Sequence, residues 1–469
     1  MIGLGTMGRN LVQNMCEHGF TVAGFDKDIK QVELFNREIS EKNAFATNKL
    51  DEFIDALSKP RVILMLVPAG HIVDVVIDEL KPFLSGQDLL IDCGNSHFSD
   101  TNKRIDSLLR QNLHFMGVGI SGGEEGARYG PSIMPGGDEK IYPRIAPVFE
   151  AISAKVQNEP CVAWLGPRAT GHYVKMVHNG IEYGIMQLIS EVYHLLKEIG
   201  GMNNPELQQA FQSWNNGLLN SFLIEITADI FGQKDELAGG ELIDNILDSA
   251  KQKGTGKWAS QDAMDLGIPI PAIDAAVTSR ELSAQKKERL RAEEILKPSA
   301  IQNKIDKVEI LRLCEQALYF SMITTYSQGM SLLYHASEEY HFNLQLETVA
   351  KIWRGGCIIR SAFLEKIRLA FAQQPEASNL MLNESIAKEL TEAQHSIRAL
   401  IKIAIDGAVP VPAMMASLAY FDGYGSGWLP SNLIQAQRDF FGAHTYERND
   451  REGIFHTKWL QHENNGSNQ

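Results

Sequence analysis

Hydrophobic and polar positions follow two different periods along this chain. Up to about residue 169, short apolar runs of strand length alternate with stretches in which apolar residues recur every three to four positions. This alternation is typical of a doubly wound parallel sheet that carries helices on both faces. The strand-length runs are residues 21–25, 62–67, 89–92 and, more weakly, 114–118.

The first helical stretch is preceded by a glycine-rich turn. Gly3, Gly5 and Gly8 form a GxGxxG pattern, which lets a backbone approach a pyrophosphate at the N-terminus of a helix. Asp26 closes the next strand, 18 residues after Gly8, where a carboxylate can accept hydrogen bonds from both hydroxyls of an adenosine ribose. The glycine pattern is weak by itself, but its context and Asp26 together predict a dinucleotide site.

The start of the chain departs from this scheme. Only Met1 and Ile2 precede Gly3, whereas a central parallel strand normally runs for about five residues. The first strand is therefore expected to be very short, either because the sheet tolerates it or because the chain starts at an internal Met.

Helical periods alone continue from about residue 169 to about residue 428, where Gly, Ser, Asn and Pro become frequent. The sequence thus predicts an α/β domain of the Rossmann type over residues 1–169. A large all-helical domain over residues 170–428 and a C-terminal tail over residues 429–469 are expected to follow.

The helical part contains an internal echo. Tyr183 and Trp214 in its first half match Tyr319 and Trp353 in its second half, at offsets of 136 and 139 residues. We expect two halves of similar plan, as after a duplication.

The helix expected at the start of the all-helical domain has an unusual polar face. Lys175, His178, Asn179, Glu182 and Tyr183 follow the spacing i, i+3, i+4, i+7 and i+8, so they share one face. A base, an acid, an imidazole, an amide and a phenol together suggest a catalytic surface. The alternative is a half-buried helix with an ordinary solvated face.

Other candidate ligand contacts lie in loops and in the tail. The glycine-bearing loops 93–96 and 121–123 follow strand runs, where open α/β sheets bind ligands, although each could be a turn without function. Lys253 in KGTGKW and Arg280 are candidate phosphate contacts. The tail residues Arg438 and His444 are either functional or surface charges on a docking arm.

Composition and charge narrow the function. The 469 residues are 44% hydrophobic and 22% charged, as in a soluble globular protein. A net charge of −14 without a Lys/Arg tract argues against nucleic acid or an anionic membrane as a partner. No apolar run reaches membrane-span length, and no signal peptide is expected. The five widely spaced cysteines show no metal-ligand spacing, so a reduced, cytoplasmic setting without a metal is expected.

Together these motifs resemble the decarboxylating 6-phosphogluconate dehydrogenase family. The resemblance extends over essentially the whole chain and is carried by GLGTMGRN, IDCGNS, GISGGEEGARYGPSIMPGG, GHYVKMVHNGIEYG, KGTGKW and RDFFGAHTYER with EGIFHT. It implies oxidation and decarboxylation of 6-phosphogluconate to ribulose 5-phosphate and CO2 with a nicotinamide dinucleotide. It also implies that Lys175 accepts the C3 hydroxyl proton and that Glu182 protonates C1 of the resulting enediol.

The resemblance further implies which residues contact the ligands, and it implies an active site that holds no metal. It also implies a homodimer in which each tail reaches the partner's active site. The implied substrate contacts are Asn95, Ser121, Gly122, Gly123, His178, Asn179, Tyr183, Lys253, Arg280, Arg438 and His444. The implied cofactor contacts are Gly3, Gly5, Thr6, Met7, Gly8, Asp26, Lys27, Val67, Pro68, Ala69 and Asn95.

The chain departs from the family pattern at the cofactor. Members that use NADP typically have Asn-Arg-Thr after the second strand and a Lys in the loop at residues 66–69. Here Asp26-Lys27-Asp28 and Pro68 stand in those places, so a 2′-phosphate meets two acids and NAD is expected to be preferred. Lys27 could still pair with a phosphate, which leaves NADP possible. Cys93 stands where the family usually has Gly, and the sequence indicates no consequence of this difference.

Two rival functions remain open. A related β-hydroxyacid dehydrogenase without a phosphate handle would not need Lys253, Arg280 and Arg438. A non-catalytic, dinucleotide-dependent sensor would be expected to lack Lys175 or Glu182, and both are present. An assay with 6-phosphogluconate and either NAD or NADP separates the three functions.

Overall fold

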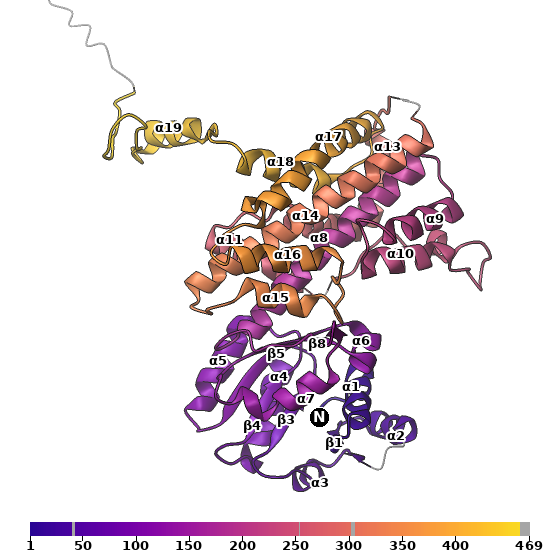
Figure 1. Ribbon diagram of the computed structural model, residues 1–469, viewed down its shortest axis with the longest axis vertical. Coiled ribbons are helices and arrows are strands. Elements are labelled where there is room, and N and C mark those ends of the chain that lie inside the picture. Colours follow the sequence, from indigo (N-terminus) through magenta and orange to yellow (C-terminus); the bar gives the residue numbers. More distant parts are fainter. Residues whose placement is uncertain (40–42, 253, 302–304, 460–469) are drawn as a thin grey trace, which may run out of the picture. The chain divides into compact units, whose positions relative to one another are not determined.

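A computed structural model describes residues 1–39, 43–252, 254–301 and 305–459 (Figure 1). It divides into two compact units, residues 1–418 and 419–469. The first unit begins with a sheet flanked by helices and continues as a bundle of helices (Figure 1). Among the described residues, no helix is both long enough and apolar enough to span a membrane.

The sheet is doubly wound, as predicted, but it is not wholly parallel. β1 pairs with β2 in parallel, and β3, β4 and β5 form a parallel set to which β6 adds an antiparallel edge. The strands are β1 (Val22–Phe25), β2 (Ala44–Thr47), β3 (Val62–Met65), β4 (Leu89–Asp92), β5 (His114–Ser121) and β6 (Ser132–Gly136), with a small hairpin of β7 (Lys155–Val156) and β8 (Glu159–Pro160).

The very short first strand expected from the sequence is present as one residue, Ile2. Its N–H donates to Leu64 O at 2.7 Å, and its carbonyl accepts from Leu66 N at 2.8 Å. On the other side, Ile2 forms a parallel bridge to Phe25, and Gly3 N donates to Phe25 O at 3.0 Å. Ile2 therefore joins β1 to β3 and makes one continuous sheet.

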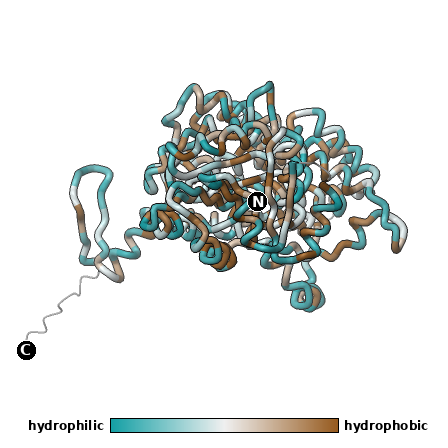
Figure 2. The backbone as a smooth tube through the Cα atoms, turned by 90° about the horizontal axis from the view of Figure 1, so that it is seen from below, coloured by the Kyte–Doolittle hydropathy of each residue, from teal (hydrophilic) through white to brown (hydrophobic). Residues whose placement is uncertain are grey.

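Alternating side chains of the strands bury the two faces of the sheet under different helices. Leu89 and Ile91 of β4 belong to one hydrophobic cluster, whereas Leu90 belongs to the other. Hydrophobic backbone segments gather around the N-terminus in the interior of this unit (Figure 2). The helices of this part are α1 (Thr6–Glu17), α2 (Ile29–Glu38), α3 (Leu50–Asp55), α4 (His71–Leu80), α5 (Phe98–Leu109), α6 (Gly123–Tyr129) and α7 (Ala146–Ile152), with 3-10 turns at Lys81–Phe83 and Tyr142–Arg144.

Long helices build the bundle, in which α8, α14 and α17 lie side by side (Figure 1). The helices are α8 (Thr170–Glu198), α9 (Asn204–Asn215), α10 (Phe222–Gly232), α11 (Thr255–Leu266), α12 (Pro271–Ala284), α13 (Lys286–Leu296), α14 (Lys307–Glu339), α15 (Leu346–Trp353), α16 (Phe363–Gln373), α17 (Glu384–Asp406) and α18 (Pro412–Tyr424), with 3-10 turns at Leu242–Asn245 and Leu380–Leu382.

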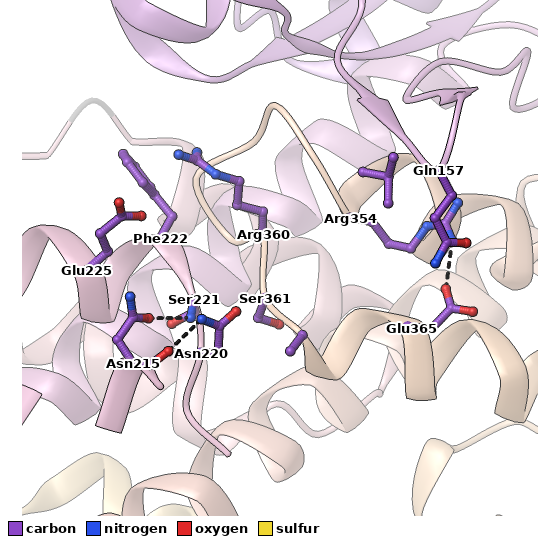
Figure 3. A pocket seen from close by; sticks show the side chains of 12 residues that line it. Gln157, Asn215, Asn220, Ser221, Phe222, Glu225, Arg354, Arg360, Ser361 and Glu365 are labelled. Carbon is purple, nitrogen blue, oxygen red and sulfur yellow. Dashed lines mark hydrogen bonds and ion pairs between the residues drawn. The ribbon is translucent and has the colours of Figure 1, made fainter. Parts of the chain in front are cut away.

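The two halves of the bundle repeat one order of elements, in agreement with the sequence echo. In each half a long helix, α8 or α14, is followed by two shorter ones. The halves meet where Ser221 and Ser361 form an antiparallel bridge. A pocket beside this bridge is lined by polar side chains from both halves, including Arg354 and Arg360 (Figure 3). Arg354 is already held there by Glu365 at 2.7 Å, so the junction is internally charge-paired.

The second unit is more ordered than the tail expected from the sequence. Helix α19 (Ser431–Gly442) is followed by an extended segment in which Tyr446 and Phe455 form an antiparallel bridge. The carboxylate of Asp439, fully buried, accepts hydrogen bonds from Thr457 N at 3.0 Å and from Trp459 Nε1 at 2.8 Å. A buried carboxylate with several donors thus organises a segment that has little apolar core of its own.

Candidate active site

Helix α8, which carries the polar face of Lys175 and Glu182, packs directly on the sheet because the glycines of β5 have no side chains. A Cβ on Gly119 would lie 2.4 Å from Lys175 Cβ, and a Cβ on Gly117 would lie 2.7 Å from His172 Nδ1. Either distance is too short for two non-bonded atoms. The weak strand run predicted at residues 114–118 is β5, the longest of the described strands. Its glycines weaken the apolar pattern in the sequence, and they also leave the space that α8 occupies.

Lys175 and Glu182 lie on α8, and their pKa values are shifted in opposite directions. Burial lowers the pKa of Lys175, while the charges of Glu182 and the Cys357 thiol act in the other direction. Burial raises the pKa of Glu182, against the attraction of Lys175 and Arg280. A lysine that loses its proton more easily and a carboxyl that keeps its proton more easily are suited to act as base and acid.

His178 is fully buried and neutral between these two groups. Burial, followed by the charge of Lys175, holds the pKa of His178 well below its ordinary value. Its Nδ1 lies 3.1 Å from Asn179 Oδ1, and its Nε2 lies 3.2 Å from Ser121 Oγ. Because an amide oxygen only accepts, Nδ1 carries the hydrogen and Nε2 accepts from the Ser121 hydroxyl. The Nδ1 atom is 3.8 Å from Glu182 Oε2.

The loop that carries Ser121 depends on glycine. Gly122 has a φ of 132°, and a Cβ there would lie 2.5 Å from Gly356 O. Gly123 has a φ of 64° and begins α6. The loop therefore combines a left-handed backbone with close packing against the segment after α15, and both features require a glycine at position 122.

Arg280 on α12 stands against the same face of α8. Its guanidinium carbon lies 3.5 Å from the centre of the Tyr183 ring, a cation–π contact. Burial lowers the pKa of Arg280, while Tyr183 and Glu182 favour its charge. The tyrosine in turn needs Gly256 of α11, because a Cβ there would lie 2.4 Å from the ring.

A small pocket brings together elements that are far apart in the sequence. It combines the loop after β4, the first turns of α8 and the start of α11. Thr255 and Trp258 of α11 line it, whereas the candidate phosphate contact Lys253 lies outside the described residues. The lining residues are Asn95, Ser96, His172, Lys175, Met176, Asn179, Thr255 and Trp258.

Among these lining residues, His172 and Trp258 were not sequence candidates, although the sequence held a signal for His172. His172 precedes Lys175 by three positions, so it shares the polar face of α8. Trp258 lies within the KGTGKW motif but becomes recognisable only because its ring meets His97 at 5.0 Å. Among the described residues, no group of three or more His, Cys, Asp or Glu side chains is arranged to hold a metal ion.

The glycine-rich turn has the backbone geometry that a pyrophosphate needs. A Cβ on Gly3 would lie 2.4 Å from Leu66 O, and a Cβ on Gly8 would lie 2.0 Å from Gly3 O. A Cβ on Gly5 would meet no atom within 4 Å, so this glycine faces open space just before α1, where Thr6 and Met7 begin the helix. The first and third glycines thus allow tight packing, and the second leaves room for a phosphate.

The acid after β1 is held in place by backbone donors. Asp26 Oδ2 accepts from Leu4 N at 2.8 Å, and Asp26 Oδ1 accepts from Asp28 N at 2.9 Å. The neighbouring Lys27 is already paired, because its ammonium forms an ion pair with Glu79 Oε1 at 2.6 Å. The residues Val67, Pro68 and Ala69 follow β3, and Asn95 follows β4, at the same carboxyl edge of the sheet.

The two tail candidates belong to the second unit. Arg438 Nη1 donates to Gln435 Oε1 at 3.1 Å, and the ring of His444 meets Phe441 edge-on at 5.9 Å. Their placement at a substrate site stays a prediction.

Comparisons with known proteins agree over both parts of the chain. Residues 1–166 match the family model described as the NAD binding domain of 6-phosphogluconate dehydrogenase, and residues 171–459 match that of its C-terminal domain. The chain is 48% identical to the NADP(+)-dependent, decarboxylating 6-phosphogluconate dehydrogenase of Bacillus subtilis, with 98% of each chain covered. It is 47% identical to the decarboxylating enzyme of Escherichia coli, again with 98% of each covered.

A solved structure gives the same result in three dimensions. The 6-phosphogluconate dehydrogenase of Plasmodium falciparum superposes with a TM-score of 0.94 at 41% identity, covering 98% of this chain and 99% of that one. The resemblance inferred from the motifs is thereby confirmed. The chain belongs to the 6-phosphogluconate dehydrogenase family.

Proposed function

We propose that the protein oxidises and decarboxylates 6-phosphogluconate to ribulose 5-phosphate and CO2 while it reduces a nicotinamide dinucleotide. The observation that carries this proposal is the pair on α8, a buried lysine with a lowered pKa and a carboxyl with a raised pKa. A pocket that Lys175 shares with Asn95, at the carboxyl edge of the dinucleotide-binding sheet, supports it.

Lys175 acts as the base of the first step. The C3 hydroxyl gives its proton to the neutral amine as the C3 hydrogen leaves with its electron pair, and C3 becomes a ketone. The nicotinamide supplies the hydride acceptor when it is bound. Lys175 is then an ammonium beside the new carbonyl, where its charge stabilises the developing enolate.

Decarboxylation follows from the 3-keto acid. The bond between the carboxylate and C2 breaks, CO2 leaves, and the electron pair drains into the C3 carbonyl, whose oxygen takes the proton of the Lys175 ammonium to give an enediol. Glu182, with its raised pKa, holds the proton that is delivered to the former C2, which is C1 of ribulose 5-phosphate. As this carbon is protonated, the hydroxyl on the former C3 gives its proton to Lys175 and becomes the ketone of the product. Both residues regain their starting state when a proton passes from the Lys175 ammonium to the Glu182 carboxylate.

A phosphorylated acid needs local cations in a chain whose net charge is −14. Arg280, on a helix that faces α8, provides one such charge, and Lys253 and Arg438 are proposed to add two more. The proposed substrate contacts are Asn95, Ser121, Gly122, Gly123, His178, Asn179, Tyr183, Lys253 and Arg280, with Arg438 and His444 from a partner subunit.

NAD is the proposed cofactor, with NADP as a weaker one. Asp26 is oriented by two backbone donors, and its acceptor capacity suits two ribose hydroxyls but not a 2′-phosphate. Lys27 is engaged by Glu79 at 2.6 Å, which reduces its capacity to compensate. The Bacillus subtilis relative is described as NADP(+)-dependent, so this preference would distinguish the present chain from it.

A single assay series tests the reaction and the cofactor. The kcat/KM of the purified protein is measured with 6-phosphogluconate and either NAD or NADP at equal concentrations. We expect turnover with release of CO2 and a preference for NAD of roughly ten- to hundredfold, equivalent to about 1 to 3 kcal/mol. Equal or better use of NADP contradicts the cofactor proposal alone, whereas no turnover with either contradicts the reaction.

A matched variant reverses the cofactor environment. Replacing Asp26-Lys27-Asp28 by Asn-Arg-Thr and Pro68 by Lys removes the repulsion and adds a planar donor fork for a phosphate. The ratio of the two kcat/KM values should then shift toward NADP. An unchanged ratio would show that this loop does not decide the preference.

We further propose a cytoplasmic homodimer with shared active sites and domain limits at residues 169 and 428. Large apolar side chains exposed on α19 support a docked tail, notably Leu433, Ile434 and Phe441. Among the residues that the structure describes, no two cysteines form a disulfide bond, which is compatible with a reducing setting.

A further inference from the structure

We infer that His172 is a positioning residue, which ties the catalytic helix α8 to the loop after β4 and thereby fixes Asn95 relative to Lys175. This inference rests on the proposed function, in which Asn95 contacts both cofactor and substrate. His172 itself has no proposed contact with either ligand.

The imidazole of His172 is locked by two partners on different elements. The side chain is 2% exposed, with Nε2 3.0 Å from Asp92 O at the end of β4 and Nδ1 2.7 Å from Thr101 Oγ1 on α5. A backbone carbonyl only accepts, so Nε2 carries the hydrogen and Nδ1 accepts from the threonine hydroxyl. Burial lowers the pKa of His172 and favours the neutral ring, and the two contacts fix its tautomer and orientation.

Asp92 passes this constraint to Asn95. Its backbone carbonyl accepts from His172, while its fully buried carboxylate shapes the loop that follows. Gly94 N donates to Asp92 Oδ1 at 2.9 Å, and Ser96 Oγ donates to Asp92 Oδ2 at 2.6 Å. Asn95 lies between these two anchored residues, so its position follows that of Asp92.

The fold reserves space for this arrangement. A Cβ on Gly117 of β5 would lie 2.7 Å from both His172 Nδ1 and Thr101 Cγ2. The pair thus occupies the place that a strand side chain would otherwise fill. His172 and Lys175 are one turn apart on α8 and line the same pocket as Asn95. A chain of hydrogen bonds therefore runs from the two residues that flank Asn95, through Asp92, to His172 on the helix of the base.

Two substitutions separate positioning from space filling. In His172→Gln, the amide nitrogen can reach the place of Nε2 and still donate to Asp92 O. In His172→Asn, the shorter side chain reaches only the place of Nδ1, and the donor to Asp92 O is lost. We expect His172→Asn to lower kcat/KM by roughly ten- to hundredfold, because small misplacements of reacting groups have effects of that size. His172→Gln should remain within about threefold of wild type.

A double-mutant cycle with Asn95→Ala tests whether His172 acts through the loop. If it does, adding His172→Asn to Asn95→Ala should reduce kcat/KM little further, because the positioned group is already absent. Multiplying effects, or equal activities of the Asn and Gln variants, would overturn the inference. Circular dichroism and thermal unfolding check that each variant is folded.

A third variant keeps the test decisive if His172→Asn does not fold. Thr101→Val keeps the side-chain shape but removes the hydroxyl that donates to His172 Nδ1. It should lower kcat/KM and also lose most of this effect in the Asn95→Ala background. A Thr101→Val enzyme with wild-type kinetics would contradict the inference. An inactive wild-type enzyme would instead overturn the proposed function itself, so the two failures are distinguishable.

Discussion

At the scale of single residues, burial decides what the polar face of α8 can do. Lys175 and His178 are buried, and this burial is the largest influence on the pKa of each. For Lys175 and Glu182, burial moves the two pKa values toward each other. The same pair on an exposed helix would be a cation and an anion at neutral pH and could serve neither as base nor as acid.

Lys175→Met should lower turnover by at least about a hundredfold, the usual size of a general-base effect, while the folded protein still binds NADH. Stopped assays of 6-phosphogluconate oxidation and a fluorescence titration with NADH measure the two properties. More than one per cent of wild-type oxidation would contradict the assignment of Lys175 as base.

The pH dependence provides a second measure of this pair. The wild-type kcat/KM should fall at low pH as Lys175 takes up a proton and at high pH as Glu182 loses its proton. Because the Lys175 pKa is lowered and the Glu182 pKa is raised, both limbs should lie between the ordinary values of about 4.3 and 10.4. Glu182→Gln should be slower and should lack the alkaline limb. An unchanged alkaline limb would exclude Glu182 as the acid.

Glu79→Gln should increase the use of NADP by releasing Lys27. The Lys27–Glu79 pair is exposed and worth only about 0.2 to 1 kcal/mol, so we expect an increase of at most about fivefold in kcat/KM with NADP and little change with NAD. Asp78→Asn is the control, because it removes a neighbouring charge that pairs with Lys81 instead. Equal responses of the two variants would show a general charge effect.

At the scale of elements, α8 connects the sheet, the pocket and α18. Its first turns fill the space left by the glycines of β5, and its later turns hold the start of α18. Glu191, buried on α8, accepts hydrogen bonds from Ala413 N at 2.8 Å and Met414 N at 2.9 Å. Burial raises the pKa of this carboxyl to about 7, in spite of these donors.

Glu191 should make stability depend on pH. A carboxyl whose pKa is raised on folding contributes stability that is present below its unfolded value of about 4.3 and is lost as the pH rises through about 7. Relative to Glu191→Gln, the wild-type protein should lose stability on the order of 3 kcal/mol across this range. Denaturation curves from pH 4.5 to 8 measure it, with exposed Glu198→Gln as the control. Parallel curves for wild type and Glu191→Gln would contradict the prediction.

At the scale of the whole molecule, the second unit is folded but leaves large apolar side chains exposed to solvent. Asp439 holds its extended segment, while Leu433, Ile434, Phe440 and Phe441 of α19 remain more than half exposed. Apolar surface of this kind is typical of a segment that docks on another surface. Together with the adjacent Arg438, it motivates a test of shared active sites.

Subunit mixing carries out that test. Inactive Lys175→Met and inactive Arg438→Ala subunits, exchanged at equal amounts, should recover about a quarter of wild-type activity, because half of the dimers are mixed and each holds one intact site. A mixture of Lys175→Met with the Lys175→Met/Arg438→Ala double variant should stay inactive. No recovery under proven exchange would place Arg438 in the site of its own subunit.

Much of the fold was predictable because its signals are local. The apolar runs, the GxGxxG turn and the spacing on α8 depend only on residues close in sequence, and they indicated the α/β part, the helical part and the candidate site. The strand β2 was missed because Phe45 is its only large apolar residue, and β6 was missed because it contains Pro135 and Gly136. The antiparallel direction of β6 has no local signal at all.

The amino-acid sequence by itself determined the family, the polar face of α8 and the acid at the cofactor loop, because each is a pattern of neighbouring residues. Only the tertiary structure decided which of these groups are buried, that Lys27 pairs with Glu79, and that His172 spans β4 and α5. Desolvation and long-range hydrogen bonds set protonation and orientation, and both depend on segments that meet only after folding.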